Sequence, residues 1–161
     1  MLLTLTVSAQ RPVFTGRRSK VDLLGLPTRI REELGLHGMN ICTDLLAGAN
    51  RSTLAGLRES ADKARCACLL LIEPGELAMH DAKAAGDKAQ MRAMNILEAA
   101  SLLGCNAAAI GLGGKQTDAH VEMATERLKA VVERAESLEV NVLISPRPGM
   151  TSNTDDLTAL L

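Results

Sequence analysis

The chain has 161 residues, of which 47% are hydrophobic and 23% are charged, and its formal net charge is −1. This length suits one domain, and the composition is typical of a globular chain rather than a disordered one. The near-zero charge excludes the basic surface of a nucleic-acid binder, and Phe14 as the single aromatic residue excludes base stacking. No apolar run reaches the ~20 residues that cross a bilayer. We expect neither a nucleic-acid partner nor a membrane partner.

Residues 1–8 alternate apolar and polar side chains and lack the basic start of a signal peptide, so they predict a first strand. A long loop is expected over residues 9–25. The cysteines are too few for a disulfide framework and none forms a C-x-x-C pair, which favours a reducing cytoplasm. Cys66 and Cys68 fit small buried residues better than metal ligands, because no second ligand pair follows them.

Four further β-rich segments follow, each entered through a helix end and a tight turn. Their last isoleucines lie about one βα unit apart. Near-continuous apolar runs at 68–72 and 140–144 are typical of parallel strands that are covered on both faces. The sequence therefore predicts five parallel strands, the later four of which close at Ile41, Ile72, Ile110 and Ile144.

Apolar residues at spacings of three and four predict the helices between these strands. The first helix begins at Pro27, a favoured first helical residue, and turns Ile30 and Leu34 inward. It ends at Gly35. The second helix follows Asn50.

The third helix is expected to open near Asp87, a candidate N-cap residue, and to end at Gly104. The fourth opens near residue 118 and carries one apolar stripe from Val121 to Leu138. A fifth helix starts near residue 153. Each helix thus presents one apolar face, as expected for a layer packed on a sheet.

Ligands of parallel α/β proteins bind at the carboxyl ends of the strands, so the residues that follow each strand form the candidate site. The candidate acid–base residues are Asp44, Glu73 and His80. Asp44 also fits a helix-entry or loop acid, whereas Glu73 ends a buried strand and requires a partner there. His37 reads as a surface residue in a helix-to-strand turn, and His120 as a solvated or capping residue in a first helical turn.

The glycine-rich run 111–115 follows the fourth strand and offers backbone N–H groups to a phosphate. It matches neither the dinucleotide motif nor the P-loop, so ordinary turn chemistry also explains it. After the fifth strand, Arg147 is placed to bind an anion. The candidate substrate-binding residues are therefore Gly113, Lys115 and Arg147.

Three segments carry a family resemblance: 58–72, 135–144, and Leu103-Gly-Cys-Asn106 followed by Ala-Ala-Ala-Ile-Gly111. They resemble the xylose isomerase-like TIM barrels, a superfamily with sugar phosphate isomerases, epimerases and enzymes of the endonuclease IV type. The similarity runs from about Glu33 to Leu161. It implies an α/β fold, a partial (β/α)8 barrel with five parallel strands and helices outside. A single domain over 1–161, truncated after the fifth strand, is expected.

The resemblance also implies a sugar site with one divalent metal, such as Mn²⁺, Mg²⁺ or Zn²⁺, held by the later strands. In the family the fifth strand ends in a metal-binding Glu followed by Asn and His, whereas this chain has Ser145, Pro146 and Arg147. These groups do not form a ligand set for a hard cation. The other family ligands belong to strands six to eight, so no metal ligand is carried over to this chain.

Three functions remain open from the sequence. The first is a sugar phosphate isomerase/epimerase-like protein for a small sugar or sugar phosphate, incomplete or inactive as this chain alone. The second is a non-catalytic barrel remnant or assembly module, a homo-oligomer or a partner of another chain, because five parallel strands cannot close a barrel. The third is a doubly wound sheet that binds a phosphorylated ligand at 111–115.

Overall fold

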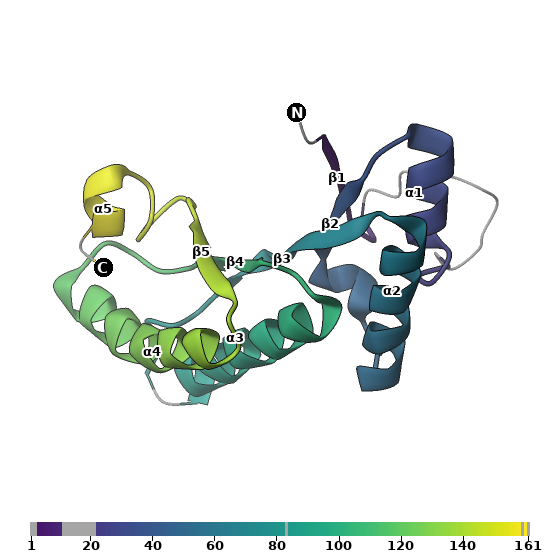
Figure 1. Cartoon of the computed structure of the whole chain (residues 1–161). Helices are drawn as coiled ribbons and strands as arrows, with labels where there is room; N and C mark the ends of the chain where they lie inside the picture. Colours follow the sequence, from purple (N-terminus) through teal and green to yellow (C-terminus); the bar gives the residue numbers. More distant parts are fainter. Residues whose placement is uncertain (1–2, 11–21, 83, 159, 161) are drawn as a thin grey trace.

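A computed structural model describes residues 3–10, 22–82, 84–158 and 160 of the chain. Five strands form one parallel sheet in the order β1-β2-β3-β4-β5 (Figure 1). This sequential order confirms five parallel strands and excludes the doubly wound alternative, whose strand order reverses. The strands are β1 (Thr4–Val7), β2 (Gly38–Cys42), β3 (Ala67–Leu77), β4 (Ala107–Leu112) and β5 (Asn141–Ser145).

The helices follow the strands in alternation; α2, α3 and α4 pack on one face of the sheet, and α1 packs beside α2 (Figure 1). A short 3-10 helix, η1, separates β2 from α2. None of the helices in the described part of the chain combines the length and apolar character that a membrane crossing requires. The helices are α1 (Leu26–Leu34), η1 (Thr43–Leu46), α2 (Arg51–Ala64), α3 (Ala84–Leu103), α4 (Asp118–Ser137) and α5 (Thr154–Thr158).

The hydrophobic core lies between the sheet and the helices. Val7, Ile41, Leu71 and Ala108 are paired across four strands, and each is at most 2% exposed. Successive residues of a strand point to opposite faces, so the residues beside this row face away from the helices. We call that opposite face, which carries Ile72, Ala109 and Leu143, the inner face. Leu143 is 46% exposed there, because no layer of the described chain covers it.

The residue types at the helix ends predicted most of those ends correctly. Gly35 and Gly104 adopt the left-handed conformation after α1 and α3, with φ of 67° and 74°. The Asn50 side chain accepts a hydrogen bond from the Thr53 backbone N–H at 2.9 Å and so caps α2.

Three local expectations were wrong. Leu34 is 43% exposed rather than turned inward, because the chain leaves the helix at Gly35 and Leu36 packs on the core instead. Asp87 is not an N-cap residue, since α3 begins at Ala84 and places Asp87 within the first turn. The third strand does not end at Glu73 but continues to Leu77.

All four cysteines are free and buried, in agreement with their interpretation as small core residues. Burial raises the pKa of the Cys68 thiol to about 12, and burial likewise raises the pKa of Cys105 to about 12. The thiol rather than the thiolate is therefore the stable form in the core at neutral pH.

We predict that the native protein resists thiol reagents at pH 8. Raising a thiol pKa from 9.0 to about 12 lowers the thiolate fraction, and with it the labelling rate, by about a thousandfold at Cys68 and Cys105. Labelling followed by mass spectrometry, with and without denaturant, measures this rate. Rapid labelling of either residue in the folded protein would contradict the buried placement.

Candidate functional site

A bulge interrupts β3 near its carboxyl end. Ile72 pairs with Ala109 and Glu76 pairs with Gly111, so the three residues 73–75 lie opposite the single residue Ile110 of β4. The sequence Glu73-Pro74-Gly75 explains the bulge, because proline has no N–H for the ladder and is tolerated at such positions. The alternation of the strand turns Glu73 toward the helix layer, because Leu71 faces that layer and Ile72 faces away from it. The two extra residues of the bulge preserve the alternation and leave Glu76 on the inner face.

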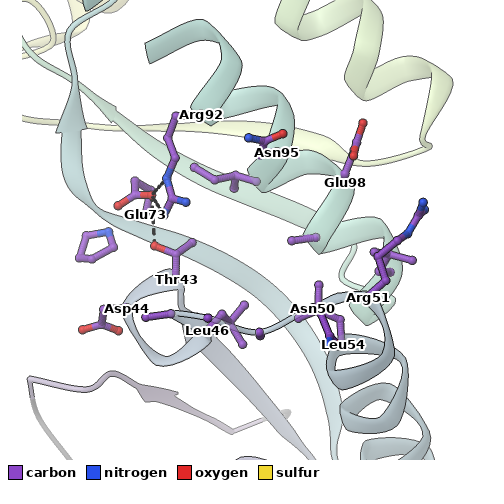
Figure 2. A pocket seen from close by; sticks show the side chains of 17 residues that line it. Thr43, Asp44, Leu46, Asn50, Arg51, Leu54, Glu73, Arg92, Asn95 and Glu98 are labelled. Atoms are coloured by element: carbon purple, nitrogen blue, oxygen red, sulfur yellow. Dashed lines mark hydrogen bonds and ion pairs between the residues drawn. The ribbon is translucent and has the colours of Figure 1, made fainter. Parts of the chain in front are cut away.

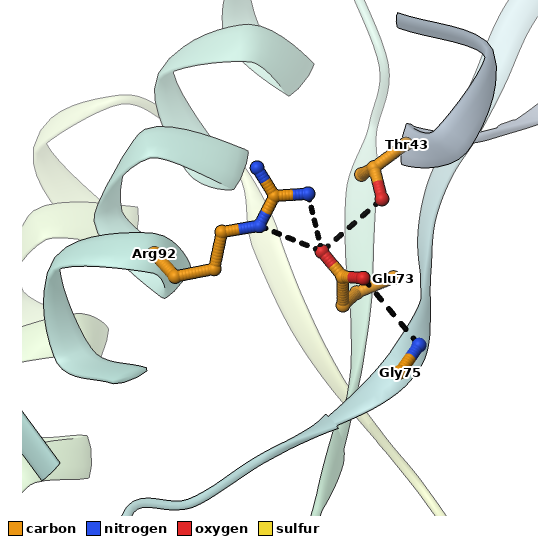
Figure 3. Close-up of polar contacts among 4 residues, drawn as sticks. All are labelled: Thr43, Glu73, Gly75 and Arg92. Atoms are coloured by element: carbon orange, nitrogen blue, oxygen red, sulfur yellow. Dashed lines mark hydrogen bonds and ion pairs between the residues drawn. The ribbon is translucent and has the colours of Figure 1, made fainter. Parts of the chain in front are cut away.

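The Glu73 carboxylate is the centre of a hydrogen-bonded network (Figure 3). The Arg92 guanidinium of α3 donates to Oε2 from Nε at 2.9 Å and lies 2.6 Å away through Nη2. Thr43 of η1 donates its hydroxyl to Oε2 at 3.1 Å, and the Gly75 backbone N–H donates to Oε1 at 3.4 Å. The Glu73 side chain is only 11% exposed. These partners supply the opposite charge and the hydrogen bonds that a buried carboxylate needs.

A pocket of about 830 Å³ lies beside this network, between η1, the start of α2, the β3 bulge and α3 (Figure 2). This volume lies within the range of small-molecule sites. Apolar side chains such as Leu54, Ile96 and Leu102 line it, and Arg92 with Glu73 supplies charge at one end. Asp44 and Glu73, two of the predicted acid–base residues, thus share one pocket.

Asp44 lies in the first turn of η1, as a helix-entry acid. Both of its carboxylate oxygens are buried and have no hydrogen-bond partner in the described chain. Leaving such a group unsatisfied in the folded state costs free energy. The two acids share the pocket but not a network, since the hydrogen bonds of Glu73 do not include Asp44.

The inner face carries a second group of charged residues at the strand ends. Glu76, Gly111 and Ser145 are paired across β3, β4 and β5 and so point to the same face. A Cβ atom at Gly111 would lie 3.0 Å from Nε of Arg147, and one at Gly113 would lie 3.2 Å from Oε2 of Glu76. Because Gly111 and Gly113 have no side chains, Arg147 and Glu76 have room to lie against β4 and the loop that follows it.

Arg147 is held from two sides. Its Nη2 donates to the Pro74 carbonyl at 3.2 Å, and its backbone N–H donates to the Thr151 hydroxyl at 3.0 Å. Its Nε is buried and has no partner in the described chain. The bond to Pro74 joins the loop after β5 to the β3 bulge.

The third predicted acid–base residue, His80, lies apart from the pocket. Its side chain is 16% exposed, its Nε2 lies 3.3 Å from Oδ1 of Asp81, and its ring centroid lies 4.6 Å from that of His120. The ring rests against Gly114, where a Cβ atom would approach it to 2.7 Å. Lys115, the next residue, is exposed and makes no contact that joins it to this cluster.

Of the other two histidines, His37 matches its expected exposure, whereas the His120 side chain neither caps the helix nor is fully solvated, because its Nδ1 is buried and its ring packs on His80. His37 is exposed, and His120 lies in the first turn of α4, where its backbone N–H donates to the capping Thr117 hydroxyl at 3.4 Å. The contact of His120 with His80 was not expected, because the residues are 40 positions apart and meet only where the start of α4 packs against the turn after β3.

Sequence reasoning missed Arg92 and Glu76. Arg92 lies on α3, which the sequence predicts from its apolar stripe. No local pattern indicates that Arg92 pairs with Glu73. Glu76 was missed because Pro74-Gly75 is a common strand-ending pair. After Gly75 the chain continues with Glu76, which is exposed, and Leu77, which is buried, as expected of strand residues. This polar–apolar alternation was the sequence signal that the strand extends past Pro74-Gly75.

The side chains at the end of β5 do not fit the divalent metal that the resemblance implies. Ser145 offers one hydroxyl, and Arg147 is a cation. In residues 3–10, 22–82, 84–158 and 160, no group of three or more His, Cys, Asp or Glu side chains is arranged to hold an ion. We therefore derive no chemical step through a metal.

No protein-family model matches the sequence, and no curated protein matches it. Solved structures do match. The chain is similar to 3-keto-D-glucoside 4-epimerase from E. coli, with 13% identity and a TM-score of 0.75 over 99% of this chain and 63% of that chain. It is also similar to a xylose isomerase domain protein from Planctomyces limnophilus, with 11% identity and a TM-score of 0.70 over 98% and 57%.

A third similar structure is the probable 3-DHS dehydratase from Bacillus anthracis, with 14% identity and a TM-score of 0.73 over 100% of this chain and 58% of that chain. At these identities the likeness shows the fold. The chain has the fold of the xylose isomerase-like TIM barrels, which confirms the predicted resemblance and the partial barrel. It spans 57–63% of the length of these three proteins.

We predict that Arg92→Met lowers the free energy of unfolding by about 1–3 kcal/mol, because it leaves the buried Glu73 carboxylate without its cation. Glu73→Gln should cost less, since the amide oxygen still accepts from Thr43. Urea unfolding measures both. Lys63→Met is the matched control, because Lys63 and Glu59 form an exposed pair, and it should change stability by under about 0.5 kcal/mol. Equal effects of Arg92→Met and Lys63→Met would contradict a stabilising network.

Proposed function

We propose that the chain forms five βα units of a sugar isomerase-like or epimerase-like barrel and binds a small sugar or sugar phosphate. The binding region is the inner face at the carboxyl ends of β3, β4 and β5. The observation that carries this proposal is the placement of Glu76 and Arg147 on that face, beside the glycines of β4. An acid and a cation at the strand ends of this fold are the groups that a polar substrate requires.

Glu76 is the acid–base residue that we favour in this proposal. Isomerisation or epimerisation next to a carbonyl requires a group that removes and returns a proton, and a carboxylate near the reacting carbon serves this role. The Glu76 side chain belongs to an exposed residue, so a ligand reaches it. Glu73 is bound by Arg92 and Thr43 on the helix side, and we assign it a structural role.

The similar structures support the class of protein but not the reaction. An epimerase, a xylose isomerase domain protein and a probable dehydratase share this fold, so the fold alone does not select among their reactions. Epimerisation returns the proton to the opposite face of the reacting carbon and so needs an acid–base group on each side of the substrate. The inner face offers Glu76 at the strand ends, and we therefore propose that binding is the contribution of these five units and that turnover requires further groups.

We predict that the protein binds a ketose such as D-fructose and that Glu76→Gln weakens this binding by about fivefold to tenfold, because the amide loses the charge that attracts hydroxyl donors. Saturation-transfer NMR in a ligand titration measures the affinity. Glu126→Gln on the exposed side of α4 is the control and should leave it unchanged. Absence of binding by any ketose or ketose phosphate would refute the proposed function.

One observation favours an assembly module as a second candidate function. Leu143 is 46% exposed on the inner face, and β5 and β1 each pair with one neighbouring strand. Exposed apolar side chains next to an open strand edge form a surface on which another chain packs. We take a second copy of this chain as the partner.

If assembly is the function, sedimentation should detect a dimer or larger species at micromolar protein. Leu143→Asp should shift it to the monomer, because a charge is then placed within the contact. Val132→Asp is the matched control, since Val132 is 44% exposed on α4 and lies on the helix side. A wild-type monomer at all concentrations would rule out self-assembly.

A further inference from the structure

The Arg147 guanidinium is a cation without an anionic partner. It makes no ion pair with any carboxylate of the described chain: Glu73 is bound to Arg92, and Glu76 lies against Gly113. The side chain is nevertheless only partly exposed, and it lies across Gly111. Partial removal of a charge from water is costly unless an opposite charge compensates it.

The hydrogen-bond donors of this guanidinium are also incompletely used. Arginine carries five N–H donors, and the structure gives one bond from this side chain, Nη2 to the Pro74 carbonyl at 3.2 Å. Its Nε–H is buried without an acceptor. A ligand with two negatively charged oxygens would accept from the remaining Nη donors in the paired geometry that a guanidinium favours.

The cation is positioned in advance of any ligand. The Arg147 backbone N–H is bound to the hydroxyl of Thr151, which is fully buried. In the same loop the Met150 backbone N–H donates to the Gly114 carbonyl at 3.0 Å, which fixes the loop after β5 against the loop after β4. A side chain held in this way loses little further entropy on binding, which favours affinity.

We propose that the ligand of the inner face is anionic and that its phosphate or carboxylate group binds Arg147 at the end of β4. This inference rests on the proposed function and narrows its ligand from a neutral sugar or a sugar phosphate to an anionic one, a sugar phosphate or a sugar acid. Lys115 follows Gly114 in the same loop and adds a second positive charge to this end of the sheet.

The test compares three probes by calorimetry at low salt: D-fructose, D-fructose 6-phosphate and D-gluconate. We expect at least one of the two anions to bind about tenfold or more tightly than fructose. Arg147→Met should remove this preference, because the anion loses its cation, whereas Arg147→Lys should keep part of it, because the charge remains without the fork. Lys63→Met, on the outer side of α2, is the charge-matched control.

The outcomes separate the two proposals. Equal affinity for fructose and both anions overturns this inference and leaves the proposed function intact, whereas binding of none of the three overturns both. An anion preference that survives in Arg147→Met places the anion elsewhere and also overturns the inference. The unfolding midpoint of each variant is measured first, and if Arg147→Met does not fold, the test is the reduced anion preference of Arg147→Lys.

Discussion

The neutralisation of one buried carboxylate determines the arrangement of the strand ends. Glu73, the first residue of the β3 bulge, lies on the helix side of the sheet because the alternation of the strand turns it there, and it is stable there because Arg92, Thr43 and Gly75 all donate to it. These donors come from α3, η1 and β3, so one carboxylate joins three elements. The same bulge presents the Pro74 carbonyl to Arg147, which joins β5 to this group. A change at residues 73–75 therefore affects both faces of the sheet.

The glycine-rich end of β4 has a different role from the one that its sequence suggests. The run 111–115 was interpreted as a cradle for a phosphate or as a simple turn. In the structure Gly111, Gly113 and Gly114 leave space for side chains of other elements, namely Arg147, Glu76 and His80. A side chain at any of these positions would meet one of those groups. The phosphate interpretation thus remains a proposal, but the group that carries it is the Arg147 side chain rather than the glycine backbone.

The sequence predicted what depends on neighbours along the chain. Apolar spacing, the cap at Asn50 and the left-handed glycines at 35 and 104 are local, and they placed the helices correctly. The bulge, the pairing of Glu73 with Arg92 and the contact of His80 with His120 depend on packing between distant segments, which no short pattern contains. Asp87 shows where local prediction stops: its residue type suits a cap, but α3 begins three residues earlier and places Asp87 in the first turn, beside Arg127.

The difference between the two faces of the sheet locates the chemistry of this chain. On the helix side the paired row from Val7 to Ala108 is almost fully buried, so a ligand has no access to it, and the acid at its end is occupied by Arg92. On the inner face the strand ends present an acid and a cation that are not paired with each other. In the proposed function, recognition at this edge rests on Glu76 and Arg147. Arg147 also donates to the Pro74 carbonyl of the β3 bulge, so a substitution at Arg147 is expected to affect the contact between the loop after β5 and the bulge as well as any ligand.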